Sequence, residues 1–279
     1  MKRVVALLGQ GVVPVDTPIL RADDLGVLRG DGVFETMHVR QGNPWLLDEH
    51  LERMVGSATR LDLELPPVSQ LRELAAEACA AWDDPSEAVL RLVCTRGPEG
   101  GGSPTVYAMV TPVSDSTRRV RREGVRIGTL SLGFPAAARA AAPWLLGGVK
   151  SLSYAVNMAC QRWATAHGLD DVLWVSAEGY ALEAPTSTLV WLEGATLYTV
   201  PTTTGILPGT TARYLFSRAE VLGWHTAERM VRPHELESAR GVWLTSSVRG
   251  VVEVRQLDDI KLPESPYTER LQDLLGYPL

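Results

Sequence analysis

A single lysine stands in an otherwise uncharged stretch near the middle of the chain. Residues 143–159 read PWLLGGVKSLSYAVNMA, and Lys150 is the one charged residue among them. The chain has only three lysines, and arginine supplies the other 24 of its 27 basic residues. Such a lysine either packs its stem on apolar neighbours and keeps its ammonium in water, or acts as a Schiff-base nucleophile that desolvation and nearby charge activate. The second role needs partners elsewhere in the chain.

Three further segments could complete a site for pyridoxal phosphate (PLP), a cofactor held by a lysine Schiff base. Glu183, in SAEGYALEAP, could place a carboxylate at the pyridine nitrogen. The stretch GILPGTTAR, 205–213, offers free N–H groups at a helix start, where a phosphate is favoured. Arg53, one turn into a helix after His50, could bind the same phosphate. Each has a plainer alternative: a solvated turn residue, a helix N-cap and a surface arginine.

In this order the motifs resemble those of the class IV aminotransferases, the fold-type IV PLP enzymes. The shared motifs are RGDGVFETMHVRQG with HLERM, then KSLSYAVN, EGYALEAPTS, GILPGTTAR and TSSVRGVVEV. They span nearly the whole chain. The resemblance implies an α/β (α+β) fold of two domains, like that of D-amino acid aminotransferase, with the active site at the domain interface. It also implies a homodimer whose pocket loops are shared across subunits.

The resemblance assigns roles to the motif residues. Lys150 matches the lysine that holds PLP and moves the substrate proton, and Tyr154 the tyrosine that hydrogen-bonds the phenolic oxygen of the cofactor. Glu183 is similar to the partner of the pyridine nitrogen and Arg53 to the phosphate arginine. The phosphate cradle is expected from Thr210, Thr211, Ser246 and Ser247. The chain departs from the family pattern at one position near the expected site: many relatives have Asn where this chain has Thr188.

The substrate pocket is expected on one strand and two loops. In FETMHV the side chains of Phe34, Thr36 and His38 share one face, which by analogy faces the substrate. Branched-chain relatives have Gly in place of Thr36, whereas lyase relatives have Thr, where it assists proton transfer. Arg29 and Arg96 lie on loops that border the pocket in this family, and arginine there binds carboxylates. Arg29 is expected to reach the neighbouring subunit's site.

These residues leave two activities open. Two loop arginines suit a D-amino acid of the D-glutamate or D-alanine type and a 2-oxo acid such as 2-oxoglutarate, so we predict D-amino acid transamination first. The alternative is 4-amino-4-deoxychorismate lyase, which eliminates pyruvate to give 4-aminobenzoate in the folate pathway, and one protein could do both. The Arg-x-His carboxylate trap of well-known D-amino acid aminotransferases is missing, because GPEGGGSP follows Arg96. Branched-chain transamination and a non-catalytic PLP-binding protein are less favoured.

Hydrophobic spacing indicates the elements that position these residues. The expected domains are a smaller α/β domain over 1–113, a polar linker over 114–124 and a PLP-binding domain over 125–279. Helices are expected at 48–63, at 68–82, after Lys150 to about His167, after the turn at 204–209 up to Gly223, and near the end of the chain. Strands are expected at 3–9, 32–42, 88–97, 105–113, 125–133, 171–183, 187–194, 196–201 and within 241–258.

Composition limits the partners and the location. A net charge of -6 disfavours nucleic acid as a partner. No run is long enough for a membrane span or a signal peptide, so a cytoplasmic enzyme acting on small amino acids and keto acids is expected. Cys79, Cys94 and Cys160 have neither disulfide nor zinc spacing and are expected to be reduced packing residues. No metal site is expected.

Overall fold

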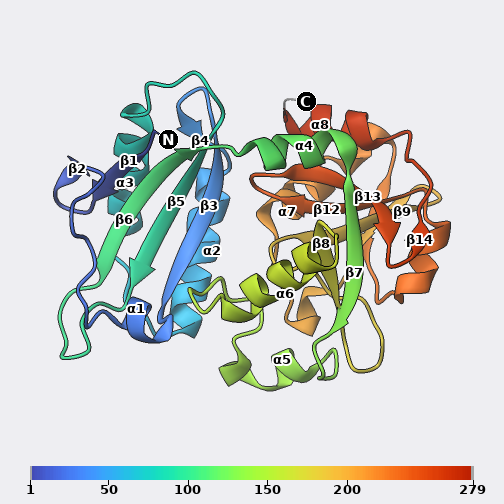
Figure 1. Ribbon diagram of the computed structural model, residues 1–279, viewed down its shortest axis with the longest axis horizontal. Coiled ribbons are helices and arrows are strands. Elements are labelled where there is room, and N and C mark those ends of the chain that lie inside the picture. Colours follow the sequence, from blue (N-terminus) through green and yellow to red (C-terminus); the bar gives the residue numbers. More distant parts are fainter. Residues whose placement is uncertain (1, 278–279) are drawn as a thin grey trace. The chain divides into compact units, whose positions relative to one another are not determined.

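The computed structural model describes residues 2–277, which form two compact units (Figure 1). The first unit contains residues 2–114 together with the short segment Val149–Tyr154, and the second contains residues 115–148 and 155–277. Each unit has a β-sheet and its own hydrophobic core. The mixed α/β architecture predicted from the sequence is therefore present. No helix of residues 2–277 is long and apolar enough to cross a membrane.

The first unit is a six-stranded sheet with the strand order β2-β1-β6-β5-β3-β4. All pairings in this sheet are antiparallel. Its strands are β1 (Val4–Leu7), β2 (Gly11–Val13), β3 (Gly32–Arg40), β4 (Asn43–Pro44), β5 (Ala88–Thr95) and β6 (Thr105–Pro112), and its helices are α1 (Leu25–Arg29), α2 (Leu47–Arg60) and α3 (Val68–Ala80). Helices α2 and α3 pack against the sheet (Figure 1).

Alternation along β3 decides which side chains these helices cover. Met37 and Val39 are buried in the core that also contains Leu51 and Met54 of α2. Phe34 and Thr36 point to the opposite face and are only half-buried. The period of two therefore places the apolar residues under the helices and leaves Phe34 and Thr36 accessible, as the sequence predicts.

The segment Val149–Tyr154 is attached to the first unit by main-chain hydrogen bonds. The N–H of Phe34 donates to the carbonyl of Lys150 at 3.2 Å, and the N–H of Leu152 donates to the carbonyl of Gly32 at 2.9 Å. Gly32 permits this close approach, because a Cβ there would lie 2.5 Å from the Cys94 carbonyl oxygen and 2.6 Å from Leu152 Cδ1. Lys150 is thus fixed against β3, more than 100 residues away in sequence.

The second unit is an eight-stranded sheet with the order β11-β10-β9-β12-β13-β7-β8, and β14 pairs with β13. Its strands are β7 (Val125–Ser131), β8 (Asp171–Val175), β9 (Thr188–Glu193), β10 (Thr196–Thr199), β11 (His225–Glu228), β12 (Gly241–Ser246), β13 (Gly250–Leu257) and β14 (Ile260–Lys261). Its α-helices are α4 (Asp115–Glu123), α5 (Ala138–Ala141), α6 (Ala155–Ala166), α7 (Thr210–Ser217) and α8 (Thr268–Leu275). Short 3-10 helices occur at Pro143–Leu145, Thr202–Thr204, Ala219–Leu222 and Pro233–Ser238.

Several elements differ from the sequence-based expectation. The polar stretch 114–124, expected as a linker, contains helix α4, which packs on β13 and buries Val120 and Arg121. The strand expected at 171–183 ends at Val175, and the helix expected to close at Gly223 gives way after Ser217 to a 3-10 turn. Helices α1 and α5 and strands β2 and β11 were not expected, because each has five residues or fewer and too few turns for periodicity to appear.

The cysteines lie in apolar surroundings, as expected. Cys79 and Cys94 are buried in the core of the first unit, and burial is the main reason that the pKa of each thiol rises to about 12. Cys160 accepts a hydrogen bond from Trp174 Nε1 at 3.3 Å. All three are free thiols.

Candidate active site

One face of helix α2 carries polar residues at helical spacing. His50, Arg53 and Ser57 are separated by three and four residues, so their side chains lie on the same side of the helix. The Ser57 hydroxyl accepts a hydrogen bond from the Lys150 N–H at 3.1 Å. Helix α2 and strand β3 therefore hold the main chain of Lys150 from two directions.

The amine of Lys150 lies beside two aromatic side chains. Its Nζ is 4.4 Å from the ring centroid of Phe34 and 3.4 Å from the hydroxyl of Tyr154. Those two rings meet edge to face, with 5.1 Å between their centroids. Phe34 thus contacts both Lys150 and Tyr154, the two residues that the family resemblance places at the aldehyde and the phenolic oxygen of the cofactor.

A buried charged network fixes the guanidinium of Arg53. Glu35, on β3, is fully buried, and the Arg53 side chain is only 9% exposed. Arg53 donates from Nε to Glu35 Oε1 at 2.8 Å and from Nη2 to Glu35 Oε2 at 2.7 Å, a bidentate pair. His50 Nδ1 lies 2.6 Å from Glu35 Oε2, which makes the histidine a second donor to the carboxylate.

Opposing effects set the protonation of this network. Complete burial of Glu35 disfavours its charged form, but the charge and hydrogen bonds of Arg53, aided by His50, outweigh burial and hold the pKa of Glu35 well below its ordinary value. Burial lowers the pKa of His50, and the charges of Arg53 and Lys150 lower it further, against the opposing effect of Glu35. At neutral pH, Glu35 and Arg53 therefore form a charge-balanced pair beside a neutral His50.

The predicted pyridine partner, Glu183, is a buried carboxylate in the second unit. It is 6% exposed. Its Oε1 accepts a hydrogen bond from Arg139 Nη1 at 3.3 Å, and its Oε2 accepts one from the N–H of Leu207 at 3.0 Å. Each oxygen of this carboxylate therefore accepts a hydrogen bond. Arg139, on α5, is a supporting residue that sequence reasoning missed.

The start of helix α7 has the features of a phosphate site. Its N-cap residue, Gly209, provides no side-chain cap, so the first N–H groups need another acceptor. Thr210 and Thr211 are buried, and the Thr211 hydroxyl has no hydrogen-bond partner within the described residues. The Thr210 hydroxyl lies 3.4 Å from that of Ser247. A phosphate could accept hydrogen bonds from the main-chain N–H groups and the orphan hydroxyl.

Two loops of the second unit support this helix start. Tyr277 donates a hydrogen bond to the carbonyl of Ser247 at 2.7 Å, and Ser246 ends β12, where it pairs with Gly250. The loop after Glu183 is held by Arg249, whose Nη2 donates to Thr186 Oγ1 at 2.9 Å, Ser187 Oγ at 2.7 Å and Asp171 Oδ2 at 2.7 Å.

Thr188, the departure from the family pattern, is buried in β9 against the start of α7. A Cβ on Gly209 would lie 2.3 Å from the Thr188 hydroxyl oxygen. The glycine of the phosphate motif is therefore required by the side chain at position 188.

The predicted substrate residues differ in their surroundings. Phe34 and Thr36 lie on the open face of β3, whereas His38 on the same face is 2% exposed. His38 Nε2 is 2.8 Å from Glu87 Oε1, and its Nδ1 accepts a hydrogen bond from Arg40 Nε at 3.0 Å. His38 thus takes part in a structural network at the end of the strand.

The two predicted carboxylate-binding arginines have carboxylate partners. Arg96 donates two hydrogen bonds to Asp31, at 2.7 and 3.2 Å, one to the Leu61 carbonyl at 2.7 Å and one to the Asp62 carbonyl at 2.8 Å. These contacts use the guanidinium to tie three segments of the first unit together. Arg29, the last residue of α1, is 67% exposed and pairs with Glu99 at 3.2 Å.

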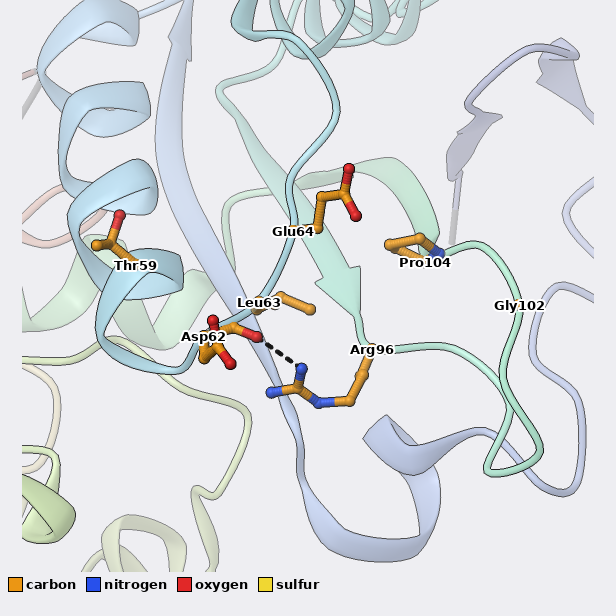
Figure 2. A pocket seen from close by; sticks show the side chains of 7 residues that line it. All are labelled: Thr59, Asp62, Leu63, Glu64, Arg96, Gly102 and Pro104. Carbon is orange, nitrogen blue, oxygen red and sulfur yellow. Dashed lines mark hydrogen bonds between the residues drawn. The ribbon is translucent and has the colours of Figure 1, made fainter.

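A surface pocket of about 460 Å³ lies beside Arg96 (Figure 2). Figure 2 shows the guanidinium of Arg96 directed at Asp62, with Glu64 on the pocket wall. Asp62 and Glu64 are both exposed. Two carboxylates in the lining make this pocket unfavourable for an anionic substrate. In this structure, therefore, Asp31 and two carbonyls occupy the donors of Arg96, and acidic residues line the pocket beside it.

Comparison with known proteins gives the family. The family model for amino-transferase class IV matches residues 32–257. The chain belongs to the class IV aminotransferases. It is 41% identical to the bifunctional aminodeoxychorismate lyase / D-amino acid transaminase of Mycobacterium tuberculosis over 281 residues, which cover 98% of this chain and 97% of that protein.

Solved structures agree with the family. An aminotransferase from Mycobacterium tuberculosis in its PLP-bound form superposes with a TM-score of 0.95 at 40% identity, covering 99% of this chain and 98% of that one. The same protein bound to α-ketoglutarate and PMP gives 0.95 at 41% identity, covering 98% and 97%. The fold IV transaminase CpuTA1 of Curtobacterium pusillum gives 0.92 at 37% identity, covering 99% and 98%. The fold is that of the fold-type IV enzymes.

PLP is the cofactor of this class IV aminotransferase, and the residues present fit it. A lysine is held beside a tyrosine, a buried carboxylate is held by two donors, and an uncapped helix start has a buried hydroxyl without a partner. These features match the aldehyde, the pyridine nitrogen and the phosphate in turn.

Sequence reasoning missed Glu35, the acid that holds Arg53 in this aminotransferase. Glu35 lies on the buried face of β3 with Met37 and Val39, and an acid on such a face is a signal that a cation must be nearby.

Proposed function

We propose that this class IV aminotransferase transfers the amino group of a D-amino acid, of the D-glutamate or D-alanine type, to a 2-oxo acid such as 2-oxoglutarate. The observation that carries the proposal is the likeness, over nearly the full length of both chains, to a relative named as a D-amino acid transaminase. The α-ketoglutarate bound in a similar structure supports a dicarboxylic acceptor.

A specific residue favours a second activity at the same site. Thr36 is half-buried on the open face of β3, two residues from Phe34, which contacts Lys150. Its hydroxyl could pass a proton to the leaving group when pyruvate is eliminated from 4-amino-4-deoxychorismate. The same relative is named as an aminodeoxychorismate lyase as well. We therefore propose lyase activity as the alternative or accompanying reaction.

We propose the roles that the family resemblance implies, and the geometry within each unit supports them. PLP supplies the electron sink that stabilises the deprotonated substrate carbon. Lys150 holds the cofactor and moves the substrate proton, and Tyr154, 3.4 Å from its amine, orients that amine and hydrogen-bonds the phenolic oxygen of the cofactor. Glu183 keeps the pyridine nitrogen protonated. Arg53 binds the phosphate, as do Thr210 and Thr211 at the start of α7 and Ser246 and Ser247 at the end of β12.

The half-reaction tests the proposal directly. The PLP-loaded protein is mixed separately with D-glutamate, D-alanine, L-glutamate and L-leucine while the cofactor absorbance is followed. We expect rapid conversion with the D-donors, and release of 4-aminobenzoate in a separate assay with aminodeoxychorismate. Lys150→Ala should bind PLP without the absorbance of the lysine-linked cofactor. Conversion by L-leucine alone, or a lysine-linked spectrum in Lys150→Ala, would contradict these assignments.

We also propose a homodimer, in which Arg29 reaches the site of the partner subunit. Helix α1 ends with Arg29, and Val27 and Leu28 on it are 56% and 50% exposed. Two exposed apolar side chains beside a loop arginine are typical of an interface. Light scattering on the PLP-loaded enzyme tests the proposal, and a monomer at assay concentrations would rule it out.

A further inference from the structure

The turn between β12 and β13 is held by two side chains from outside the hairpin. The turn consists of residues 247–249 and begins with Ser247. Tyr277 donates its hydroxyl hydrogen to the carbonyl of Ser247 at 2.7 Å, and Arg121 Nη2 donates to the carbonyl of Val248. Two successive carbonyls of a three-residue turn therefore have fixed partners.

The two donors lie against each other in the interior of the second unit. Arg121, in α4, is 2% exposed, and Tyr277, which follows α8, is 3% exposed. The guanidinium of Arg121 lies over the Tyr277 ring, 5.0 Å from its centroid. Gln272 of α8 joins the same segments, because its buried amide donates to the carbonyls of Arg121 at 2.7 Å and Val251 at 3.1 Å. Packing therefore fixes both donors in place beside the turn.

The contact between Tyr277 and the hairpin is close at Gly250. Gly250 has φ +71°, a left-handed conformation that favours glycine, and a Cβ there would lie 2.7 Å from the Tyr277 ring. The ring thus packs directly on the main chain where β13 begins. Tyr277 holds the hairpin through its ring and through its hydroxyl, and a change to phenylalanine removes only the second contact.

The held turn lies beside the start of α7. The Ser247 hydroxyl is 3.4 Å from that of Thr210, and the neighbouring Thr211 hydroxyl is buried without a partner among residues 2–277. The Ser247 carbonyl and side chain leave the same Cα, so a fixed carbonyl restricts where the hydroxyl can lie. A trans peptide places its N–H opposite its carbonyl, so the two held carbonyls also fix the directions of the Val248 and Arg249 N–H groups.

We propose that Tyr277 and Arg121 are positioning residues for the cofactor phosphate. They hold the 247–249 turn in the orientation that presents the Ser247 hydroxyl beside the start of α7. The proposal rests on the phosphate site assigned under the proposed function, and extends that site to α4 and to the segment after α8. Neither side chain needs to touch the cofactor. A turn that is already held in its bound orientation loses less conformational freedom when the phosphate binds, which strengthens binding.

The test measures the binding of PLP, and of pyridoxal, which lacks the phosphate, to the cofactor-free enzyme by fluorescence titration. Tyr277→Phe keeps the ring and removes the donor, and Tyr267→Phe makes the same change at a tyrosine whose hydroxyl contacts Arg240 instead. We expect Tyr277→Phe to bind PLP about three- to tenfold more weakly than Tyr267→Phe, with equal affinity for pyridoxal. Equal weakening of both ligands would show a general structural role and overturn the proposal, as would unchanged affinity for PLP.

A double-mutant cycle with Ser247→Ala asks whether Tyr277 acts through the serine. If it does, the fold-loss of PLP affinity in the double variant should be smaller than the product of the two single losses. Losses that multiply would show that Tyr277 acts independently of Ser247 and would contradict the proposal. Arg121→Gln should show the same loss for PLP alone, and equal weakening of PLP and pyridoxal would overturn the assignment of Arg121.

These outcomes are separate from failure of the proposed reaction. No amino acid is present in the titrations, so the substrate and its stereochemistry do not affect the Kd. If the variants give the expected Kd values but no D-amino acid is turned over, the reaction is wrong and the assignment of Tyr277 stands. If the unsubstituted enzyme binds PLP no more tightly than pyridoxal, the phosphate site itself is wrong, and the positioning role is overturned with it.

Discussion

The buried pair Glu35–Arg53 should be strongly coupled, and a double-mutant cycle can measure the coupling. Glu35→Gln removes the negative charge and leaves Arg53, with a side chain only 9% exposed, without its counter-ion. Breaking a buried pair on one side costs about 3–5 kcal/mol. Because glutamine keeps an oxygen that can accept from Arg53, we expect the lower end, about 3 kcal/mol of unfolding free energy.

The second single variant removes the cation of the pair instead of the anion. Arg53→Gln leaves a fully buried Glu35 with His50 as its remaining described donor, and should also cost about 3 kcal/mol. The pKa of Glu35 would then rise, so protonation as pH falls should relieve part of the loss. The double variant, Glu35→Gln with Arg53→Gln, has no charge at either position. Its loss of unfolding free energy should be about 3 kcal/mol smaller than the sum of the two single losses.

The assay is urea unfolding of the cofactor-free protein, because bound phosphate would itself compensate Arg53. Tryptophan fluorescence and circular dichroism must give coincident transitions, since a chain of two units need not unfold in one step. If the two single costs add to within about 0.5 kcal/mol in the double variant, the pair is not coupled. The account of Glu35 as the residue that fixes Arg53 would then be wrong.

Two further outcomes follow from the network and the helix start. His50 has a lowered pKa in the folded protein, so the unfolded chain binds more protons below pH ~6.5. The free energy of unfolding should therefore decrease as the pH is lowered through that range, by at most ~1.4 kcal/mol per pH unit. Urea midpoints of His50→Gln at pH 7.5, 6.5 and 5.5 should show a smaller decrease, and the same decrease as in the wild type would argue against a buried neutral histidine. Gly209→Ala should weaken PLP binding because its Cβ would lie 2.3 Å from the Thr188 hydroxyl oxygen. Adding Thr188→Ala should restore much of the binding, because the nearest atoms are then the Cβ of residue 188 at 3.3 Å and Ala212 Cβ at 3.7 Å. A PLP titration followed by fluorescence measures both variants, and failure of the second change to restore affinity would show that another contact is responsible.

Local motifs made much of this site predictable. Lys150 and Tyr154 are four residues apart, and the structure brings their amine and hydroxyl to 3.4 Å. The alternation of FETMHV correctly placed Phe34 and Thr36 on the face away from the helices. In each case the information lies within a few residues, where strand and helix periods operate.

Long-range pairing is what the sequence could not supply. Arg96 follows a strand end and looks like a loop arginine, but its partners Asp31, Leu61 and Asp62 come from two segments at least 34 residues away. Helix α4 looked like a linker because it is so polar, yet an i,i+4 pair between Arg119 and Glu123 supports it, while Val120 and Arg121 are buried. Amino-acid composition alone cannot distinguish a solvated linker from a polar helix, such as α4, that buries only a few side chains against a sheet.

The chain has 24 arginines and three lysines, and the chemistry of the two side chains explains their different roles at the site. Arginine stays charged at any physiological pH and forms bidentate pairs, so Arg53 and Arg249 can hold buried segments in place without titrating. A Schiff base requires an amine that can lose its proton, which a guanidinium cannot do. Arg53 is balanced by Glu35 beside a neutral His50, so the charge of this part of α2 and β3 is compensated. The chain thus pairs the permanent charge of Arg53 with Glu35 and holds Lys150 between α2 and β3 for the proposed chemistry.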